Sequence, residues 1–204
     1  TFTAGVRANY WDFNEQLVVS PRATLSFKPE WEKDVLFRFS AGLYYQPPFY
    51  RELKDLEGTI NYNQKAQTSV HVVAASDWNF NAWGRPFKFV SEVYYKYLDN
   101  LIPYLVDNVR LRYYSFDQSH GYAAGIDFKV NGEFVRGVES WASLSFLTTK
   151  EDIRNDAYIN SAGQLVEPGF IPRPTDQHVQ FSIFFQDYLP MNPTYKMSLT
   201  LLFG

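Results

Sequence analysis

The chain has 204 residues, a net charge of −3 at neutral pH and no cysteine. The lack of cysteine excludes disulfide bonds, thiolate metal sites and a cysteine nucleophile. The weakly acidic balance is unlike the basic footprint of a general nucleic-acid binder. Aromatic residues make up 19% of the chain, which excludes low-complexity disorder. The length predicts one domain. The sequence has no run of about 18 consecutive apolar residues, so no transmembrane helix is predicted.

Apolar and polar residues alternate along most of the chain, as they do in strands whose two faces meet different surroundings. In the first segment, Phe2, Val6 and Tyr10 share one face and Arg7 lies on the other. No segment longer than two turns has the spacing of an amphipathic helix. The sequence therefore predicts an all-β fold of nine strands, over residues 2–10, 17–28, 35–46, 65–80, 87–97, 122–130, 142–146, 178–186 and 195–203.

Most of the predicted strands are longer than those of soluble sheets. About 10 residues at roughly 3.3 Å each, tilted by about 45°, span roughly 23 Å, which matches the apolar band of outer-membrane barrels, about 25 Å tall. A soluble β-sandwich also alternates, but its strands are shorter and its turns come about every 8–12 residues. Aromatic residues end the apolar faces, as in interfacial girdles, at Tyr10, Phe27, Tyr45, Trp78, Phe80, Tyr95, Tyr97, Tyr122 and Tyr195.

The predicted connections alternate between short and long. Residues 29–34, 81–86, 131–138 and 187–194 are compact and rich in turn-forming residues, whereas residues 46–64, 98–120 and 149–177 form long loops. The first connection, 11–16, is short but lies on the long-loop side. In outer-membrane barrels the short turns are periplasmic and the long loops extracellular, so the first and ninth strands are expected to run outward.

An odd number of strands is unusual for a closed bacterial barrel of one chain. Nine antiparallel strands leave the two termini on opposite sides, and the sequence has neither an initiator methionine nor a signal peptide. We therefore expect residues 1–204 to be a segment of a larger transmembrane antiparallel β-barrel in the bacterial outer membrane. An independent barrel of eight or ten strands is the alternative.

Several short motifs follow one another in strand order. They are residues 20–29 (SPRATLSFKP), 38–52 (RFSAGLYYQPPFYRE), 86–97 (PFKFVSEVYYKY), 125–128 (GIDF), 171–177 (IPRPTDQ) and 184–190 (FFQDYLP). Each motif alone is too short to be specific, so the resemblance depends on several motifs that occur in the same order. In that order they resemble the barrel strands of TonB-dependent outer-membrane receptors of the Bacteroidetes type, in the C-terminal part of the barrel.

The resemblance implies a barrel of about 22 strands with a plug domain inside it, and about nine of those strands in this chain. It implies TonB-driven uptake of a scarce ligand, such as a siderophore, haem, cobalamin, a glycan or a peptide. The implied partners are outer-membrane lipid, the plug and remaining strands, and TonB. The resemblance also allows a surface lipoprotein, which some of these receptors have. The chain itself contains no plug sequence and no TonB box.

Candidate functional residues fall into two sets. Charged residues of the polar face are predicted to line the lumen or contact the plug, or to be simply solvated: Arg7, Arg22, Arg38, Glu92 and Asp127. Loop residues are predicted to bind ligand, because aromatic faces stack on sugar or porphyrin planes and arginine pairs with carboxylates or chelated metal anions. These are Tyr44, Gln46, Phe49, Tyr50, Arg51, Arg110, Arg112, Tyr113, Tyr114 and Arg173. The alternative is that they bind no ligand and only cover the loops and the aromatic girdle.

Two other functions share this alternation. A general porin would have the same strands without the ordered receptor-like motifs. A barrel enzyme would place a histidine beside an acid or a serine, and His71, His120 and His178 each have Asp or Ser nearby in the sequence. No nucleophile motif accompanies them, and no metal-ligand or phosphate-binding pattern occurs. The sequence therefore predicts no enzyme activity, cofactor or metal, and no nucleic-acid partner.

Overall fold

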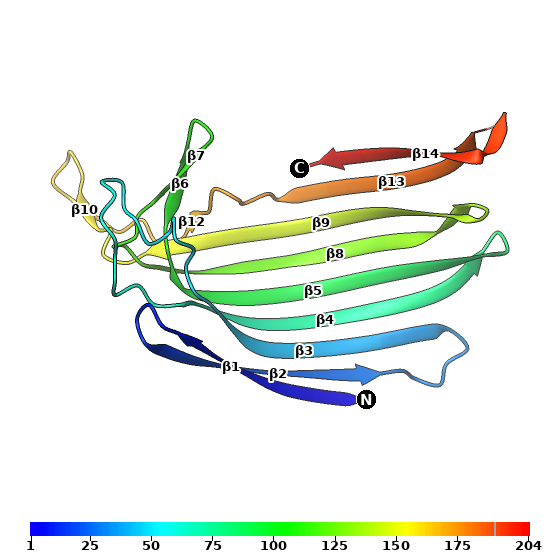
Figure 1. Cartoon of the computed structure of the whole chain (residues 1–204), viewed down its shortest axis with the longest axis horizontal. Helices are drawn as coiled ribbons and strands as arrows, with labels where there is room; N and C mark the ends of the chain where they lie inside the picture. Colours follow the sequence, from blue (N-terminus) through cyan, green and yellow to red (C-terminus); the bar gives the residue numbers. More distant parts are fainter. Residues whose placement is uncertain (190) are drawn as a thin grey trace.

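The computed structural model describes residues 1–189 and 191–204, with no account of the Pro193 side chain. Nine long strands of these residues form one antiparallel sheet in which each strand pairs with the next long strand (Figure 1). They are β1 (Phe2–Trp11), β2 (Gln16–Phe27), β3 (Asp34–Gln46), β4 (Gln67–Ala82), β5 (Arg85–Leu101), β8 (Ser119–Val135), β9 (Val138–Ile153), β13 (Val179–Leu189) and β14 (Asn192–Phe203).

The prediction of an all-β fold of antiparallel strands is confirmed. The described residues contain no helix, and so none that is long and apolar enough to cross a membrane. Several strands exceed their predictions, most of all the predicted strands 122–130 and 142–146, which extend to β8 and β9. Alternation stops near Glu133 and Lys150, but backbone pairing between β8 and β9 continues past both residues. Side-chain periodicity therefore underestimates the length of a backbone ladder.

The connections divide between the two ends of the sheet as predicted. Between β4 and β5 the turn is reduced to Trp83 and Gly84, whose φ angles of 53° and 70° are both left-handed. Such mirror-image turns match the twist of paired strands and favour glycine. The predicted turn at 187–194 includes Pro190, which lies outside the described residues.

The long connections form small additional elements at the opposite end of the sheet (Figure 1). These are the β6 (Tyr104–Asp107) and β7 (Arg110–Tyr113) hairpin, the β10 (Tyr158–Ile159) and β11 (Leu165–Val166) hairpin, and β12 (Ile171–Pro172), which pairs with β9. All of them lie in segments that were predicted to be long loops. Leu53, Ala66, Leu101 and Ile102, which lie in or next to the long connections, are buried.

The strand register keeps apolar residues opposite apolar residues across the sheet. Because directly paired residues in antiparallel strands point to the same face, one row of partners can be followed from β1 to β13. That row is Phe2, Leu25, Phe39, Ala74, Val93, Ile126, Phe146 and Val179. We call the face that carries this row the apolar face, and the opposite one the polar face.

Burial is inverted relative to a soluble sheet. Val72, on the apolar face, is 56% exposed, whereas Asp77, on the polar face, is 6% exposed. Other exposed apolar-face residues include Val6, Leu25, Phe39, Val93, Phe146 and Leu199, and other buried polar-face residues include Val18, Ser20, Ala75 and Thr149. A soluble monomer rarely exposes a contiguous apolar patch larger than a few hundred Å². The apolar face therefore requires a covering that the chain itself does not supply.

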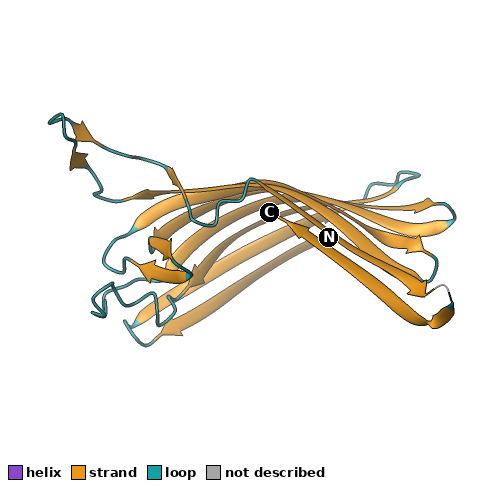
Figure 2. Ribbon diagram, turned by 90° about the horizontal axis from the view of Figure 1, so that it is seen from above, coloured by secondary structure: helices purple, strands orange, loops and turns teal. Residues whose placement is uncertain are grey.

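The sheet is twisted and curved (Figure 2) but not closed. Within the described residues β1 pairs only with β2, and β14 pairs only with β13, so the two strands form opposite edges (Figure 1). Both edge strands run toward the end that carries the long loops. Open edges leave backbone N–H and C=O groups ready to pair with further strands.

Close packing on the polar face restricts Gly125 of β8. A Cβ atom there would lie 2.5 Å from the Tyr94 hydroxyl oxygen and 2.7 Å from the Phe146 carbonyl oxygen. We expect Gly125→Ala to lower the free energy of unfolding by about 1–3 kcal/mol through overpacking. Denaturant unfolding followed by circular dichroism measures it. Gly5→Ala is the control, since its Cβ would meet nothing closer than 3.6 Å; equal effects would contradict the packing argument.

Candidate functional site

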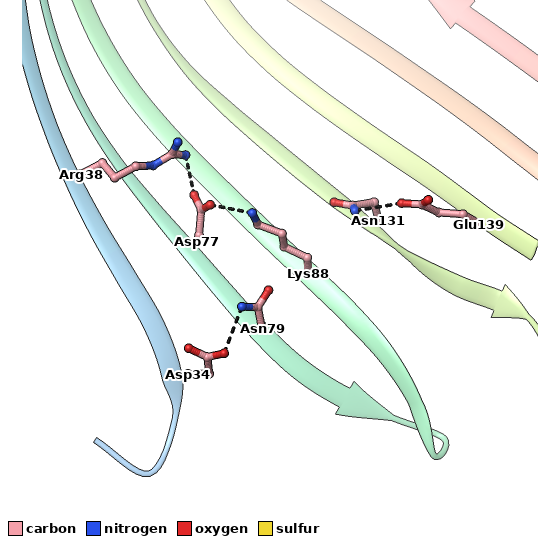
Figure 3. A network of polar contacts seen from close by, with 7 residues as sticks. All are labelled: Asp34, Arg38, Asp77, Asn79, Lys88, Asn131 and Glu139. Carbon is pink, nitrogen blue, oxygen red and sulfur yellow. Dashed lines mark hydrogen bonds and ion pairs between the residues drawn. The ribbon is translucent and has the colours of Figure 1, made fainter. Parts of the chain in front are cut away.

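An ion network crosses three strands of the polar face near the short turns (Figure 3). The buried carboxylate of Asp77 on β4 accepts a hydrogen bond of 2.6 Å from Nη2 of Arg38 on β3. Its other oxygen lies 2.7 Å from Nζ of Lys88 on β5. One carboxylate therefore pairs with a cation from each neighbouring strand and holds three charged side chains together on the polar face.

Further polar pairs extend this lining on either side of the network (Figure 3). Asn79 Nδ2 donates to Asp34 Oδ2 at 3.1 Å, and Asn131 Nδ2 donates to Glu139 Oε1 at 3.2 Å. Lys88 and these four residues contribute to the walls of a cavity of about 640 Å³. A hollow thus runs from β3 to β9 at the short-turn end of the sheet, where these polar side chains lie beside Phe80 and Phe87.

The five residues predicted to line a lumen all lie on this polar face. Arg38, Glu92 and Asp127 belong to one row of strand partners, with Ala75 between the first two. That register makes Asp77, rather than Glu92, the carboxylate that Arg38 contacts. Glu92 and Asp127 face each other directly, an arrangement of like charges that is unfavourable without high-dielectric or cationic surroundings.

Arg7 and Arg22 lie elsewhere, in a groove of about 420 Å³ on β1–β3. The same groove is lined by Tyr44 and Gln46, two of the residues predicted to bind ligand. From the sequence, the two arginines were predicted to line the lumen, and Tyr44 and Gln46 were predicted to bind ligand. The strand register unites them, because Arg22 is the partner of both Gly5 on β1 and Gly42 on β3.

The other loop candidates are partly brought together at the long-loop end. Phe49 and Tyr50 are exposed, and Lys54 Nζ lies 4.7 Å from the centre of the Tyr50 ring. Tyr113 lies on β7, and burial, with a smaller contribution from the Glu52 carboxylate, raises the pKa of its hydroxyl, while Arg51 lowers it. Charged residues of the loop 47–66 therefore lie close enough to the β6–β7 hairpin to act on Tyr113. The Tyr113 hydroxyl stays protonated at neutral pH and can donate a hydrogen bond.

The remaining arginine candidates differ in their freedom to bind a ligand. Arg112 forms an exposed pair with Asp107 at 2.7 Å, and Arg110 lies opposite the same aspartate across the hairpin. Arg173 is mostly buried, 3.9 Å from a carboxylate oxygen of Glu151 and with its guanidinium 5.5 Å from the centre of the Tyr104 ring. Arg173 thus already has protein partners, and a ligand role for it stays a prediction.

Tyr114 is the last of the loop candidates. Its backbone N–H donates to the Pro103 carbonyl at 2.9 Å and closes the base of the β6–β7 hairpin. Asp117 in turn donates its N–H to the Tyr114 carbonyl at 3.1 Å. The backbone of Tyr114 is therefore structural, and any ligand contact would depend on its ring.

Two of the three histidines lie beside aspartates in the structure. His178 Nε2 lies 3.0 Å from Asp176, and His120 Nε2 lies 3.8 Å from Asp152 rather than from Asp117. The buried Ser119 hydroxyl donates to Glu151 at 2.7 Å and not to a histidine. Within residues 1–189 and 191–204, no group of three or more His, Asp or Glu side chains could hold a metal ion.

Sequence reasoning missed a buried polar hub beneath the long loops. Gln64 is completely buried, and its carbonyl accepts a hydrogen bond of 2.8 Å from Asn14. Asn61 Nδ2 donates both to Gln64 Oε1 at 3.2 Å and to the Ser115 carbonyl at 2.6 Å. These contacts tie the β1–β2 loop to two long loops. Loop residues have no periodicity, so no sequence signal identified them.

Comparison with models of protein families, with curated proteins and with solved structures finds no match for this chain.

The Asp77 network yields a stability prediction. We expect Asp77→Asn to lower the free energy of unfolding by about 1–3 kcal/mol, because it leaves Arg38 and Lys88 as adjacent, unpaired cations. Asp34→Asn is the matched control, since Asp34 pairs with Lys28 in an exposed position and exposed pairs contribute little. Denaturant unfolding compares the two variants, and an equal loss in both would contradict the special role of Asp77.

Proposed function

We propose that this chain is a segment of a transmembrane β-barrel in the bacterial outer membrane, and that the barrel belongs to a TonB-dependent receptor. The observation that best supports a location in the membrane is the apolar face, which is continuous over eight strands and exposed. Hydrocarbon covers such a face without requiring a protein partner. In a bilayer every backbone polar group must also be paired, which long antiparallel strands achieve once their edges are closed.

Aromatic residues at both ends of the apolar face support the same proposal. Trp78 and Phe80 lie together near the short turns, with ring centres 4.7 Å apart, and Tyr95 stacks on Tyr122 toward the long loops. On β5, Phe87 and Tyr95 are separated by roughly 26 Å along the strand. After a tilt of about 35–45° this separation approaches the thickness of the apolar band, where Tyr and Trp favour both interfaces.

The distribution of loops and charges supports a receptor. The long connections gather at one end and carry exposed aromatic residues such as Phe49 and Tyr50 (Figure 1). The polar face holds many of the charged groups of the strands, including the Arg38–Asp77–Lys88 network. The proposal places ligand capture at the loops, followed by passage along the polar face after rearrangement of a plug, with energy supplied through TonB. The ordered receptor-like motifs favour this mechanism over a general porin.

The membrane step predicts opposite tolerance to charge on the two faces of β9. Phe146 lies on the apolar face, and Ser145 lies beside it on the polar face opposite Asp127. We expect Phe146→Arg to destabilise the membrane-inserted form by about 2–4 kcal/mol near the bilayer midplane. Ser145→Arg should insert normally and can pair with Asp127. Phe146→Leu controls for loss of the ring.

The measurement is recovery of folded, heat-modifiable protein from purified outer membranes. A Phe146→Arg variant that is recovered as well as Ser145→Arg would contradict a lipid-facing role for the apolar face.

The receptor step predicts the composition of the native protein. We expect intact-mass measurement and sequencing of the protein from purified outer membranes to find a chain much longer than 204 residues, with a plug and a TonB box. Uptake of its ligand should stop when the TonB box is deleted, because energy coupling is lost. A complete 204-residue species that folds in detergent would overturn the receptor and leave a small porin or a barrel enzyme.

A further inference from the structure

The groove on β1–β3 has an unusual local construction. Arg22 on β2 is flanked in register by Gly5 on one side and Gly42 on the other. Because neither neighbour has a side chain, the Arg22 side chain can lie over Gly5, where a Cβ would be 3.6 Å from Arg22 Nε. A Cβ at Gly42 would lie 2.9 Å from the Tyr44 ring and 3.1 Å from the Arg22 Cβ. The two glycines therefore create the hollow into which Arg22 and Tyr44 fit.

Tyr44 is fixed in position by a second contact. Its ring centre lies 4.4 Å from that of His71 on β4. The phenol therefore forms an ordered wall at the long-loop end of the groove, next to Gln46 at the end of β3. Because the Tyr44 ring is already held in place, less side-chain entropy is lost when a ligand binds.

The charge of the groove is positive without local compensation. Its lining contains Arg7 and Arg22 but no Asp or Glu. In the part of the chain that the structure describes, neither guanidinium forms an ion pair, and Arg7 Nε donates only to the neutral Asn9 side chain, at 3.1 Å. Arg38, on the same face, is instead paired with Asp77. The two arginines of the groove thus keep donors available on one side of the sheet.

We propose that this groove is a binding site for an oxyanion, a carboxylate or phosphate group carried by the transported ligand. Guanidinium groups bind such anions through paired, charge-assisted hydrogen bonds. The hydroxyls of Ser20 and Tyr44 and the amide of Gln46 add neutral donors around the same space. The link to transport rests on the proposed function, whereas anion binding itself does not depend on it.

The test is calorimetric titration of the native, detergent-purified protein that contains this chain, with succinate and with inorganic phosphate in separate experiments at low ionic strength. We expect saturable binding of at least one probe, weakened by added salt. Binding of succinate alone assigns a carboxylate, and binding of phosphate alone assigns a phosphoryl group. Arg22→Gln should weaken binding at least tenfold, and Arg22→Lys should retain part of it.

Arg136→Gln is the matched control, since it removes the same charge at the β8–β9 turn, outside the groove. Folding of each variant is checked by heat-modifiable migration. Absence of saturable binding, or equal weakening by Arg136→Gln and Arg22→Gln, would overturn the site. If the protein takes up its ligand through TonB but binds neither anion, the anion site is contradicted and the receptor proposal stands. Anion binding in a protein without TonB coupling overturns the receptor and leaves the groove.

Discussion

The structure depends on a two-residue alternation that is kept in register through consecutive strands. Each antiparallel pairing preserves the face of its residues, so one slipped residue would move a whole strand's apolar set to the polar side. The pairing of Phe39 with Ala74, and of Ala74 with Val93, shows how the rule extends from strand to strand. The sheet acquires two chemically different faces because this rule holds across it, without a second layer of protein.

The polar face has to solve the problem that this separation creates. Its charges cannot be dispersed on both sides of the sheet, so they meet one another within a few residues. Asp77 is buried and shared by two cations, whereas Glu92 and Asp127 face each other as like charges. A face that holds both arrangements suits contact with water and polar partners, since like charges in a dry interior would be strongly unfavourable.

Most of the sheet could be predicted from the sequence because alternation is a local property. Residues 35–46 alternate clearly, and β3 occupies Asp34–Gln46. The ends of β8 and β9 and the small hairpins could not be predicted, because backbone pairing there proceeds without side-chain alternation. The candidate site divides in the same way: the faces of Arg7 and Arg22 followed from periodicity, but their meeting with Tyr44 depends on register between three strands. The Gln64 hub depends on loop geometry, which no local pattern encodes.

Register also explains why the groove and the open edge occur together. Arg7 lies on β1, whose outer side has no partner among the described residues. If further strands extend the sheet there, they add their polar-face residues to the same wall as Arg7 and Arg22. A carboxylate contributed by such a strand would pair with an arginine of the groove as Asp77 pairs with Arg38, whereas a neutral neighbour would leave it as an anion site. The titration with Arg22→Gln therefore also reports on the chemistry of the strand that lies beside β1.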